Sequence, residues 1–350
     1  MKIDLKQLKE HVSAGLISER KHPTEELYIY NYTKGCTIEK KWDDTTMAAR
    51  GLILDKAGHI IARPFKKFFN YSELPTDFKL PNLPYKIFKK LDGSLGISYW
   101  VGDKLYIATR GSFESEQSAK ANEILQKDYY KKIYNLSHNK TYLFEIISRP
   151  SKIVVNYEFE DLILIGIVDY RTGKESSLNS QNVFKVVETV TLSKNFEELQ
   201  ALNIPNEEGY VIRYDNGFRF KLKFEDYIRL HAIITNCSNK AIWESLRAFI
   251  DIDKYLKDIP DELYNWVTKT KNEFQNAYNA IYNKHLDFIK SLDLSNKDLK
   301  EITSIFSQNS NEYNFHILIN LYRGKFRYVN EIIWDILKPK YEKPYFNGQN

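Results

Sequence analysis

Short hydrophobic runs with a two-residue period dominate the chain from about Glu26 to Lys223, and they predict β-strands. The predicted strands are Leu27–Tyr32, Gly51–Asp55, Ile60–Arg63, Lys86–Lys90, Leu95–Trp100, Lys104–Thr109, Thr141–Ile147, Leu162–Val168 and Gly209–Tyr214. A short amphipathic helix is predicted before them, from Leu5, and a second helix at Glu114–Leu125 interrupts them. This mixture predicts antiparallel sheets with helices packed alongside.

After Lys223 the hydrophobic residues change to a helical period. The stripe that predicts a long helix over Asp261–Ile289 consists of Leu263, Val267, Phe274, Tyr278, Ile281 and Phe288. Ser295 with Asp298 predicts a capping box before another helix. We therefore predict an α+β chain, with an antiparallel-sheet domain at residues 1–239 and an all-helical domain at residues 240–350.

Composition limits the class of protein without choosing one. A chain of 350 residues with 43% hydrophobic residues can form two domains, and a net charge of +5 suits a polyanionic partner. Only Cys36 and Cys237 occur, without a Cys-x-x-Cys pair, and the seven histidines show no metal-ligand spacing. This argues against a disulfide framework and a zinc site.

No stretch approaches the roughly 20 apolar residues that span a bilayer, and the first residues do not resemble a secretory signal. We expect a cytoplasmic protein without a membrane segment, or a viral protein that acts in the host cytoplasm.

The segment Lys90-Leu91-Asp92-Gly93-Ser94 carries the first chemical signal, because it puts an amine beside a carboxylate and a glycine turn between two predicted strands. A nucleophilic lysine must be uncharged, so its pKa must fall below the usual value of about 10.4. Neighbouring cations and burial both lower a lysine pKa. Alone, the segment also fits a solvated turn.

Other charged residues along the chain change the balance. Lys221 and Lys223 alternate within a predicted strand, so both ammonium groups lie on one face. Carboxylates and cations also recur at Glu145, Glu208, Arg50 and Lys67. Singly, each fits a solvent-exposed position. Together they match what nucleotidyl transfer from a triphosphate requires, because cations neutralise phosphates and carboxylates hold a divalent metal or the ribose.

These motifs resemble the covalent nucleotidyltransferases, and among them the RNA ligases of the T4 RNA ligase 1 type. Lys90–Leu95 is similar to the nucleotide-accepting motif of that family. The other segments that carry the resemblance are Tyr30–Tyr32, Arg50–Gly51, Arg63–Asn70, Arg110–Gln117, Phe144–Glu145, Lys152–Tyr157, Glu208–Val211, Phe220–Lys223, Tyr227, Leu230–His231 and Leu318–Gly324. The helical tail also fits, because DNA ligases and capping enzymes of the superfamily usually carry a β-rich domain there.

The resemblance implies ATP-dependent RNA ligation in three steps. Lys90 would attack the α-phosphorus of ATP to form lysyl-AMP, AMP would pass to an RNA 5′-phosphate, and an RNA 3′-hydroxyl would displace it. The residues implied in ATP binding are Tyr30, Arg50, Lys67, Lys90, Glu145, Glu208, Lys221 and Lys223. Mg²⁺ is the implied metal, with Glu145 and Asp253 as ligands, although Asp253 equally fits a helix-terminus charge. Arg110 and Tyr227 are implied in the RNA-joining steps.

The implied partner is RNA with 5′-phosphate and 3′-hydroxyl ends, such as a cleaved tRNA loop, selected by the helical region. A kinase-phosphatase would prepare such ends. Three alternatives stay open: another polynucleotide ligase or a GTP-dependent capping enzyme, an RNA-end adenylyltransferase, and a non-catalytic RNA-binding module on the same scaffold. Because Leu162–Asp169 is aliphatic where many relatives place an aromatic ring, no residue is assigned to stack on adenine.

Overall fold

The structure, a computed structural model, describes residues 3–149, 154–252 and 261–341 of an α+β chain. Internal contacts divide it into two units, Met1–His231 and Ala232–Asn350. The division falls within helix α6 (Glu225–Asn236), a few residues before the predicted boundary at 239/240. Each unit is described by itself.

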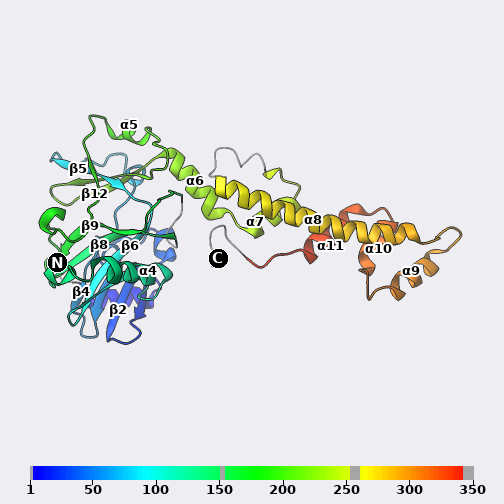
Figure 1. Ribbon diagram of the computed structural model, residues 1–350, viewed down its shortest axis with the longest axis horizontal. Helices are drawn as coiled ribbons and strands as arrows, with labels where there is room; N and C mark the ends of the chain where they lie inside the picture. Colours follow the sequence, from blue (N-terminus) through cyan, green and yellow to red (C-terminus); the bar gives the residue numbers. More distant parts are fainter. Residues whose placement is uncertain (1–2, 150–153, 253–260, 342–350) are drawn as a thin grey trace. The chain divides into compact units, whose positions relative to one another are not determined.

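The described residues of the first unit form three four-stranded antiparallel sheets, and all nine strands predicted above are present in them (Figure 1). In sheet order, the first sheet is β1 (Ile17–Lys21), β2 (Leu27–Tyr32), β3 (Arg50–Asp55) and β4 (Ile60–Ala62). The second is β10 (Thr189–Val190), β5 (Tyr85–Lys90), β11 (Gly209–Tyr214) and β12 (Arg219–Lys223). The third is β7 (Lys104–Thr109), β6 (Ser94–Val101), β8 (Lys140–Ile147) and β9 (Asp161–Asp169).

The helices of this unit are short and cover the sheets. They are α1 (Leu5–Ser13), α2 (Lys34–Ile38), α3 (Asp44–Ala48), α4 (Glu116–Ile124), α5 (Phe196–Gln200) and the start of α6. Ala121 and Ile124 of α4 pack on the third sheet against Phe144, within the largest hydrophobic core (Figure 1). Short helical turns at Tyr71–Glu73, Leu125–Tyr129, Ile133–Asn135 and Leu178–Ser180 complete the unit.

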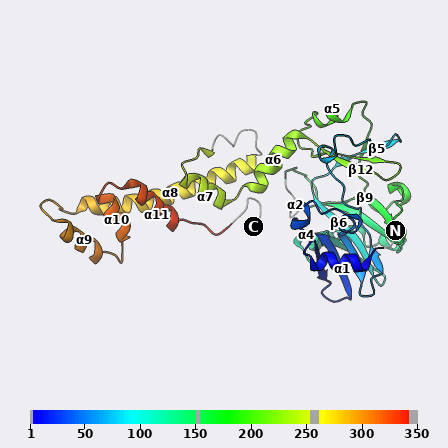
Figure 2. The ribbon, with the colours of Figure 1, turned by 180° about the vertical axis from the view of Figure 1, so that it is seen from behind.

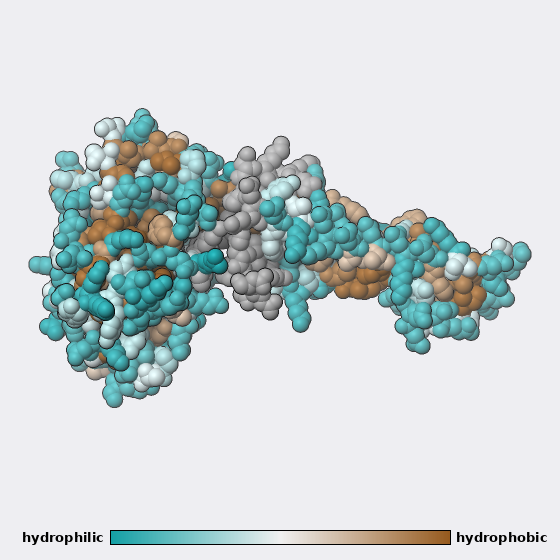
Figure 3. Space-filling view, in the orientation of Figure 1, coloured by the Kyte–Doolittle hydropathy of each residue, from teal (hydrophilic) through white to brown (hydrophobic). Residues whose placement is uncertain are grey.

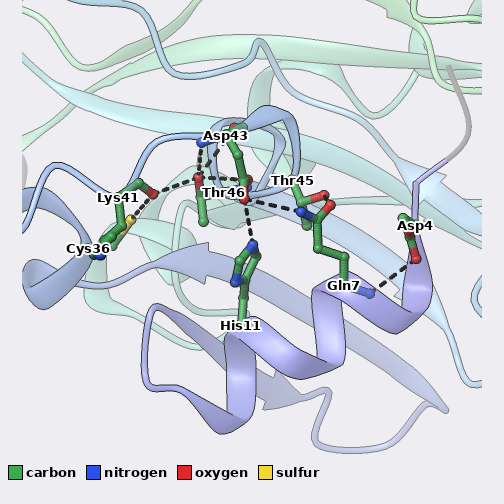
Figure 4. A network of polar contacts seen from close by, with 8 residues as sticks. All are labelled: Asp4, Gln7, His11, Cys36, Lys41, Asp43, Thr45 and Thr46. Carbon is green, nitrogen blue, oxygen red and sulfur yellow. Dashed lines mark hydrogen bonds and ion pairs between the residues drawn. The ribbon is translucent and has the colours of Figure 1, made fainter.

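Helix α1 lies across the first sheet, where the fully buried Leu8 enters the core (Figure 2). A polar network holds α1 to α3 (Figure 4): His11 Nε2 lies 2.7 Å from Asp43 Oδ2, and Thr45 Oγ1 donates to Gln7 Oε1 at 2.6 Å. Asp43 also caps α3. Since α3 leads directly into Arg50, the network fixes the approach of that residue to the site described below.

The described part of the second unit is helical and contains no strand. Its helices after α6 are α7 (Asn239–Arg247), α8 (Asp261–Ser291), α9 (Leu299–Gln308), α10 (Phe315–Tyr322) and α11 (Phe326–Ile336). The long helix α8 confirms the predicted stripe. The predicted cap was wrong: Asp298, not Ser295, caps α9 and forms the capping box with Glu301. Among the residues described, no helix has the length and apolar character that a bilayer span needs.

Candidate active site

A cavity of about 820 Å³ is lined by residues of the second and third sheets of the first unit. Lys90 ends β5 in one sheet and Ser94 begins β6 in the other, so the segment between them crosses from sheet to sheet rather than closing a hairpin. Gly93 makes the crossing close, because a Cβ there would lie 2.5 Å from the carbonyl oxygen of Ile146. The Lys90 side chain thereby reaches the cavity wall.

Glu208 joins two lysines at this wall. Its Oε2 accepts a hydrogen bond from Lys90 Nζ at 2.6 Å, its Oε1 lies 2.8 Å from Lys223 Nζ, and the residue is only 2% exposed. Gly209 follows at φ +138°, and a Cβ there would lie 2.1 Å from the carbonyl oxygen of Leu222. A glycine is therefore required for Glu208 to reach both lysines.

The charge state of Lys90 differs from the expectation. Burial opposes its charge, but the carboxylates of Glu208 and Glu145 outweigh burial and hold the pKa of Lys90 above its ordinary value. The expectation that cations lower the pKa of this lysine was wrong for the protein alone. The pKa of Glu208 lies below its usual range. Burial raises it, but the charges of Lys90 and Lys223 lower it by more than burial raises it.

Lys221, in contrast to Lys90, has a lowered pKa. Burial, followed by the charges of Arg50, Lys67, Lys90 and Lys223, lowers the pKa of Lys221 to about 7. It lines the same cavity as Lys90 and Lys223, so the predicted common face of β12 is confirmed. These cations lie together and repel one another, which is an arrangement suited to an anion.

Asp92 was not predicted as a site residue, yet it ties the crossing segment to two distant parts of the unit. Its Oδ2 accepts from the backbone N–H groups of Val154 and Val155 at 2.7 and 2.9 Å. Its Oδ1 accepts from the Tyr227 hydroxyl at 2.8 Å, and its own N–H donates to the Tyr157 hydroxyl at 2.9 Å. Asp92 therefore positions Lys90, and Tyr227, predicted for the joining steps, is buried with its hydroxyl already engaged.

Glu145 is the carboxylate that fits a hydrated metal. Its Oε1 accepts from the Gly93 N–H at 3.1 Å, and among the described residues Oε2 accepts no hydrogen bond. Burial raises its pKa to about 7. The oxygens of Glu208 and Asp92 are engaged, and the described residues form no group of three or more metal ligands. One carboxylate matches Mg²⁺, which is commonly held by one or two carboxylates together with substrate phosphates and waters. Asp253 lies outside the described residues.

Arg50 and Arg110 add further cations to the cavity wall, and Arg50 lies close to Lys221, since both contact the Phe68 ring. Burial lowers the pKa of Arg50, and its Nη1 is buried without a hydrogen-bond partner in the described residues. Arg110 Nη1 donates to the Tyr32 hydroxyl at 3.1 Å. Lys67 lines a neighbouring cavity of about 400 Å³, with its Nζ over the rings of Trp42 and Phe69 at 5.4 and 4.3 Å.

The structure does not bring Tyr30 to the cavity. Its ring is buried in the core beneath α1, with Leu8 and Leu52, on the face of β2 opposite Asn31. Asn31 lines the cavity instead, and its Oδ1 has no hydrogen-bond partner in the described part of the chain. Adjacent residues of a strand point to opposite faces, so only one of Tyr30 and Asn31 can reach the cavity, and the pattern does not say which.

The sequence interpretation also missed five residues that line the cavity: Phe88, Val211, Glu175, Arg213 and Arg219. The two-residue period could have found four of them. Phe88 alternates with Lys90 in β5, Val211 and Arg213 alternate with Gly209 in β11, and Arg219 alternates with Lys221 in β12. Glu175 has no such signal.

Known proteins with similar sequences are RNA ligases. The family model described as RNA ligase matches residues 48–228, just over half of the chain. An RNA ligase of Rhodothermus phage RM378 is 24% identical over 344 residues, covering 73% of this chain and 76% of the relative. A putative RNA ligase of Thermovibrio ammonificans is 31% identical over 200 residues, covering 53% of this chain and 52% of the relative, about half its length. Among solved structures, an archaeal ATP-dependent RNA ligase is 13% identical with a TM-score of 0.47, covering 80% of each chain.

Proposed function

This chain belongs to the RNA ligase family, and from that premise we propose that it joins RNA 5′-phosphate and 3′-hydroxyl ends at the expense of ATP, with Lys90 as the nucleophile. The observation that carries the proposal is the position of Lys90 in a cavity of about 820 Å³ whose walls also carry Lys221, Lys223 and Arg50. A lysine among cations is suited to attack on a polyphosphate, because the cations neutralise the charge that otherwise repels a nucleophile.

In the first step Lys90 Nζ attacks the α-phosphorus of ATP, the N–P bond forms, and the bond to pyrophosphate breaks. In this structure Lys90 is an ammonium paired with Glu208, so the pair must separate and the lysine must lose a proton before attack. Lys221 and Lys223 lie on the same face of β12 and stabilise the charge on the α-phosphate. Arg50, with its buried Nη1 unpartnered in the described residues, receives the outer phosphates.

Glu145, whose Oε2 accepts no hydrogen bond in the described residues, would hold Mg²⁺, and the metal would supply charge neutralisation at the phosphates. The first unit's other carboxylates near Lys90 serve different purposes. Glu208 orients the two lysines, and Asp92 fixes the segment that carries Lys90.

In the later steps AMP passes from Lys90 to an RNA 5′-phosphate, and the RNA 3′-hydroxyl displaces it. Arg110 lines the cavity and is proposed to contact the RNA phosphate at this stage. Breakage of RNA by many nucleases leaves ends of the opposite kind, so a kinase-phosphatase would have to restore a 5′-phosphate and a 3′-hydroxyl first. A cleaved tRNA is the proposed physiological substrate.

Residues 240–350 are proposed to select the RNA. Hydrophobic side chains lie exposed among polar ones on the visible face of this region (Figure 3). The exposed aromatic residues include Tyr264, Tyr322, Phe326 and Tyr328. Exposed aromatic rings beside cations are suited to stack on unpaired bases.

The proposal is tested by incubating the protein with ATP, Mg²⁺ and a single-stranded RNA that carries a 5′-phosphate and a 3′-hydroxyl. A sealed, phosphatase-resistant product is expected from the wild type, and matched reactions with a nicked DNA duplex and with GTP distinguish the alternative substrates. An RNA-end adenylyltransferase would stop at adenylylated RNA. Binding of RNA without adenylate on protein or RNA would refute ligation and favour a binding module.

A further inference from the structure

Glu175, Arg213 and Arg219, here called the edge cluster, form a set of charges at the cavity wall that the proposed chemistry does not use. Arg219 Nη2 donates to Glu175 Oε1, and Arg213 Nε lies 3.1 Å from Glu175 Oε2. The side chains of Arg219 and Glu175 are only 8% and 18% exposed. Charges this deeply buried require partners, and the cluster supplies only part of what Arg213 needs.

The strand register fixes where the edge cluster lies relative to Lys90. Paired residues of β5, β11 and β12 form three successive rows: Lys90–Gly209–Lys223, Phe88–Val211–Lys221 and Lys86–Arg213–Arg219. Two residues of a strand advance about 6.6 Å, so the third row lies about 13 Å from the first. This is the scale of an extended nucleoside monophosphate.

The middle row decides which part of a nucleotide lies between Lys90 and the edge cluster. Lys221, at one end of this row, faces the α-phosphate, whereas Phe88 and Val211 present an apolar floor, and Ile165, Leu178 and Val187 line the same cavity. Apolar walls suit a planar base and not a phosphate. With the α-phosphorus near Lys90 and Lys221, the base therefore lies over Phe88 and Val211, and its outer edge reaches the edge cluster.

Arg219 of the edge cluster packs against an aromatic ring. The Arg219 guanidinium lies 3.9 Å from the ring centroid of Phe65, which is close enough for a cation–π contact. The Phe65 ring in turn lies against Gly166 of β9, where a Cβ would be 2.1 Å from it. Arg219 is thereby fixed and it fixes Glu175, whereas Arg213 Nε is buried without a hydrogen-bond partner among the described residues, since its N–H is not directed at the nearby oxygen.

Resting on the proposed ATP-dependent function, we propose that Glu175 and Arg213 read the edge of the purine and select adenine. Adenine presents an amino donor at C6 beside an acceptor at N1. The Glu175 carboxylate accepts from the amino group, and Arg213 donates to the ring nitrogen. A 6-oxopurine reverses both groups, so its O6 would face the carboxylate and its N1–H would face the guanidinium.

The experiment compares ATP with two analogues: purine riboside triphosphate, which lacks the C6 amino group, and inosine triphosphate, which carries the 6-oxo group. For each, binding to the full chain is measured by calorimetry, and formation of the covalent nucleotidyl protein is measured as an initial rate. The variants are Glu175→Gln and Arg213→Met. The controls are Glu188→Gln, which removes an exposed carboxylate, and Lys86→Met, which removes a charge from the same row outside the cavity wall.

The wild type and both controls should prefer ATP over either analogue by roughly tenfold or more, because a lost or reversed hydrogen bond leaves buried polar groups unpaired. Glu175→Gln should reduce this preference to within about threefold, and inosine triphosphate should gain most, since the amide can donate to O6. Arg213→Met should weaken the binding of ATP and of purine riboside triphosphate by similar factors, because both nucleotides retain N1 as an acceptor.

Ratios within one variant do not depend on how much of it is folded. An equal loss for all three nucleotides in Glu175→Gln would overturn the base-reading role and indicate a structural or phosphate-binding cluster. By contrast, normal binding preferences without any covalent adduct would contradict the proposed ligase chemistry and leave the base-reading role supported.

Discussion

Replacement of Lys221 by methionine should stabilise the protein and abolish its chemistry. Lys221 has a pKa of about 7 in place of 10.5, with burial as the largest cause and Arg50 as the next. A pKa difference of one corresponds to about 1.4 kcal/mol, so the charge on Lys221 destabilises the folded state by on the order of 5 kcal/mol below pH 7. Methionine keeps the length of the side chain and removes the charge.

Part of this gain is lost, because the Lys221 ammonium also lies 5.1 Å from the centroid of the Phe68 ring. Even the replacement of a buried ion pair by apolar groups is often neutral or stabilising by about 1 to 4 kcal/mol. We therefore expect Lys221→Met to raise the free energy of unfolding by about 2 to 4 kcal/mol at pH 6 to 7.

The stability difference between the two proteins should depend on pH. The folded pKa of Lys221 lies below its unfolded value, so the unfolded state binds more protons between about pH 7 and 10.5. Wild-type stability should rise with pH through that window relative to Lys221→Met, and the advantage of the variant should shrink by pH 9.

The assay is urea denaturation of both proteins from pH 6 to pH 9 in buffers free of phosphate and sulfate. Lys223→Met is the matched control, because Lys223 is paired with Glu208 at 2.8 Å and its loss should destabilise. Lys221→Met should also fail to form lysyl-AMP. A variant less stable than the wild type at pH 7, or a difference that does not change with pH, would refute the lowered pKa of Lys221.

Three further predictions concern the surroundings of the site. Glu208→Gln should lower the free energy of unfolding by about 3 kcal/mol at neutral pH, because it leaves two lysines without their shared carboxylate. Since the pKa of Glu208 is depressed, its contribution is present above pH 4.5 and lost as pH falls through the folded pKa, so denaturation curves of the two proteins should converge in acid. Tyr227→Phe should cost about 1 to 3 kcal/mol in urea denaturation by removing the hydroxyl that donates to Asp92, and an unchanged midpoint would contradict that contact. A chain ending at Asn239 should keep lysyl-AMP formation and some joining of simple strands but lose preference for a cleaved tRNA loop; an equal loss on both RNAs, with the fold verified by circular dichroism, would place the tail in the catalytic unit.

The strands and the shared face of Lys221 and Lys223 could be predicted because they depend on local periodicity. The position of Tyr30 could not, because β2 is buried on both faces and periodicity does not say which face meets the cavity. Asn31, its neighbour, reaches the cavity instead.

Properties that depend on residues distant along the chain could not be predicted from local sequence patterns. The raised pKa of Lys90 results chiefly from Glu208, which is 118 residues away along the chain. Glu175 becomes a candidate site residue only in the folded chain, where Arg219 of β12 donates a hydrogen bond to it. Local patterns thus predicted in which strands the charged residues lie, but the fold decides which charges neutralise one another.

Covalent linkage of AMP to Lys90 can be measured directly. The protein is incubated with ATP labelled at the α-phosphorus and Mg²⁺, the adduct is isolated, and the modified peptide is identified by mass spectrometry. We expect one acid-stable, amine-linked adenylyl group on Lys90, released by pyrophosphate, and none in Lys90→Ala or Lys90→Arg, since a guanidinium stays protonated. An adduct on another residue, or equal labelling of the Lys90→Ala protein, would contradict the account.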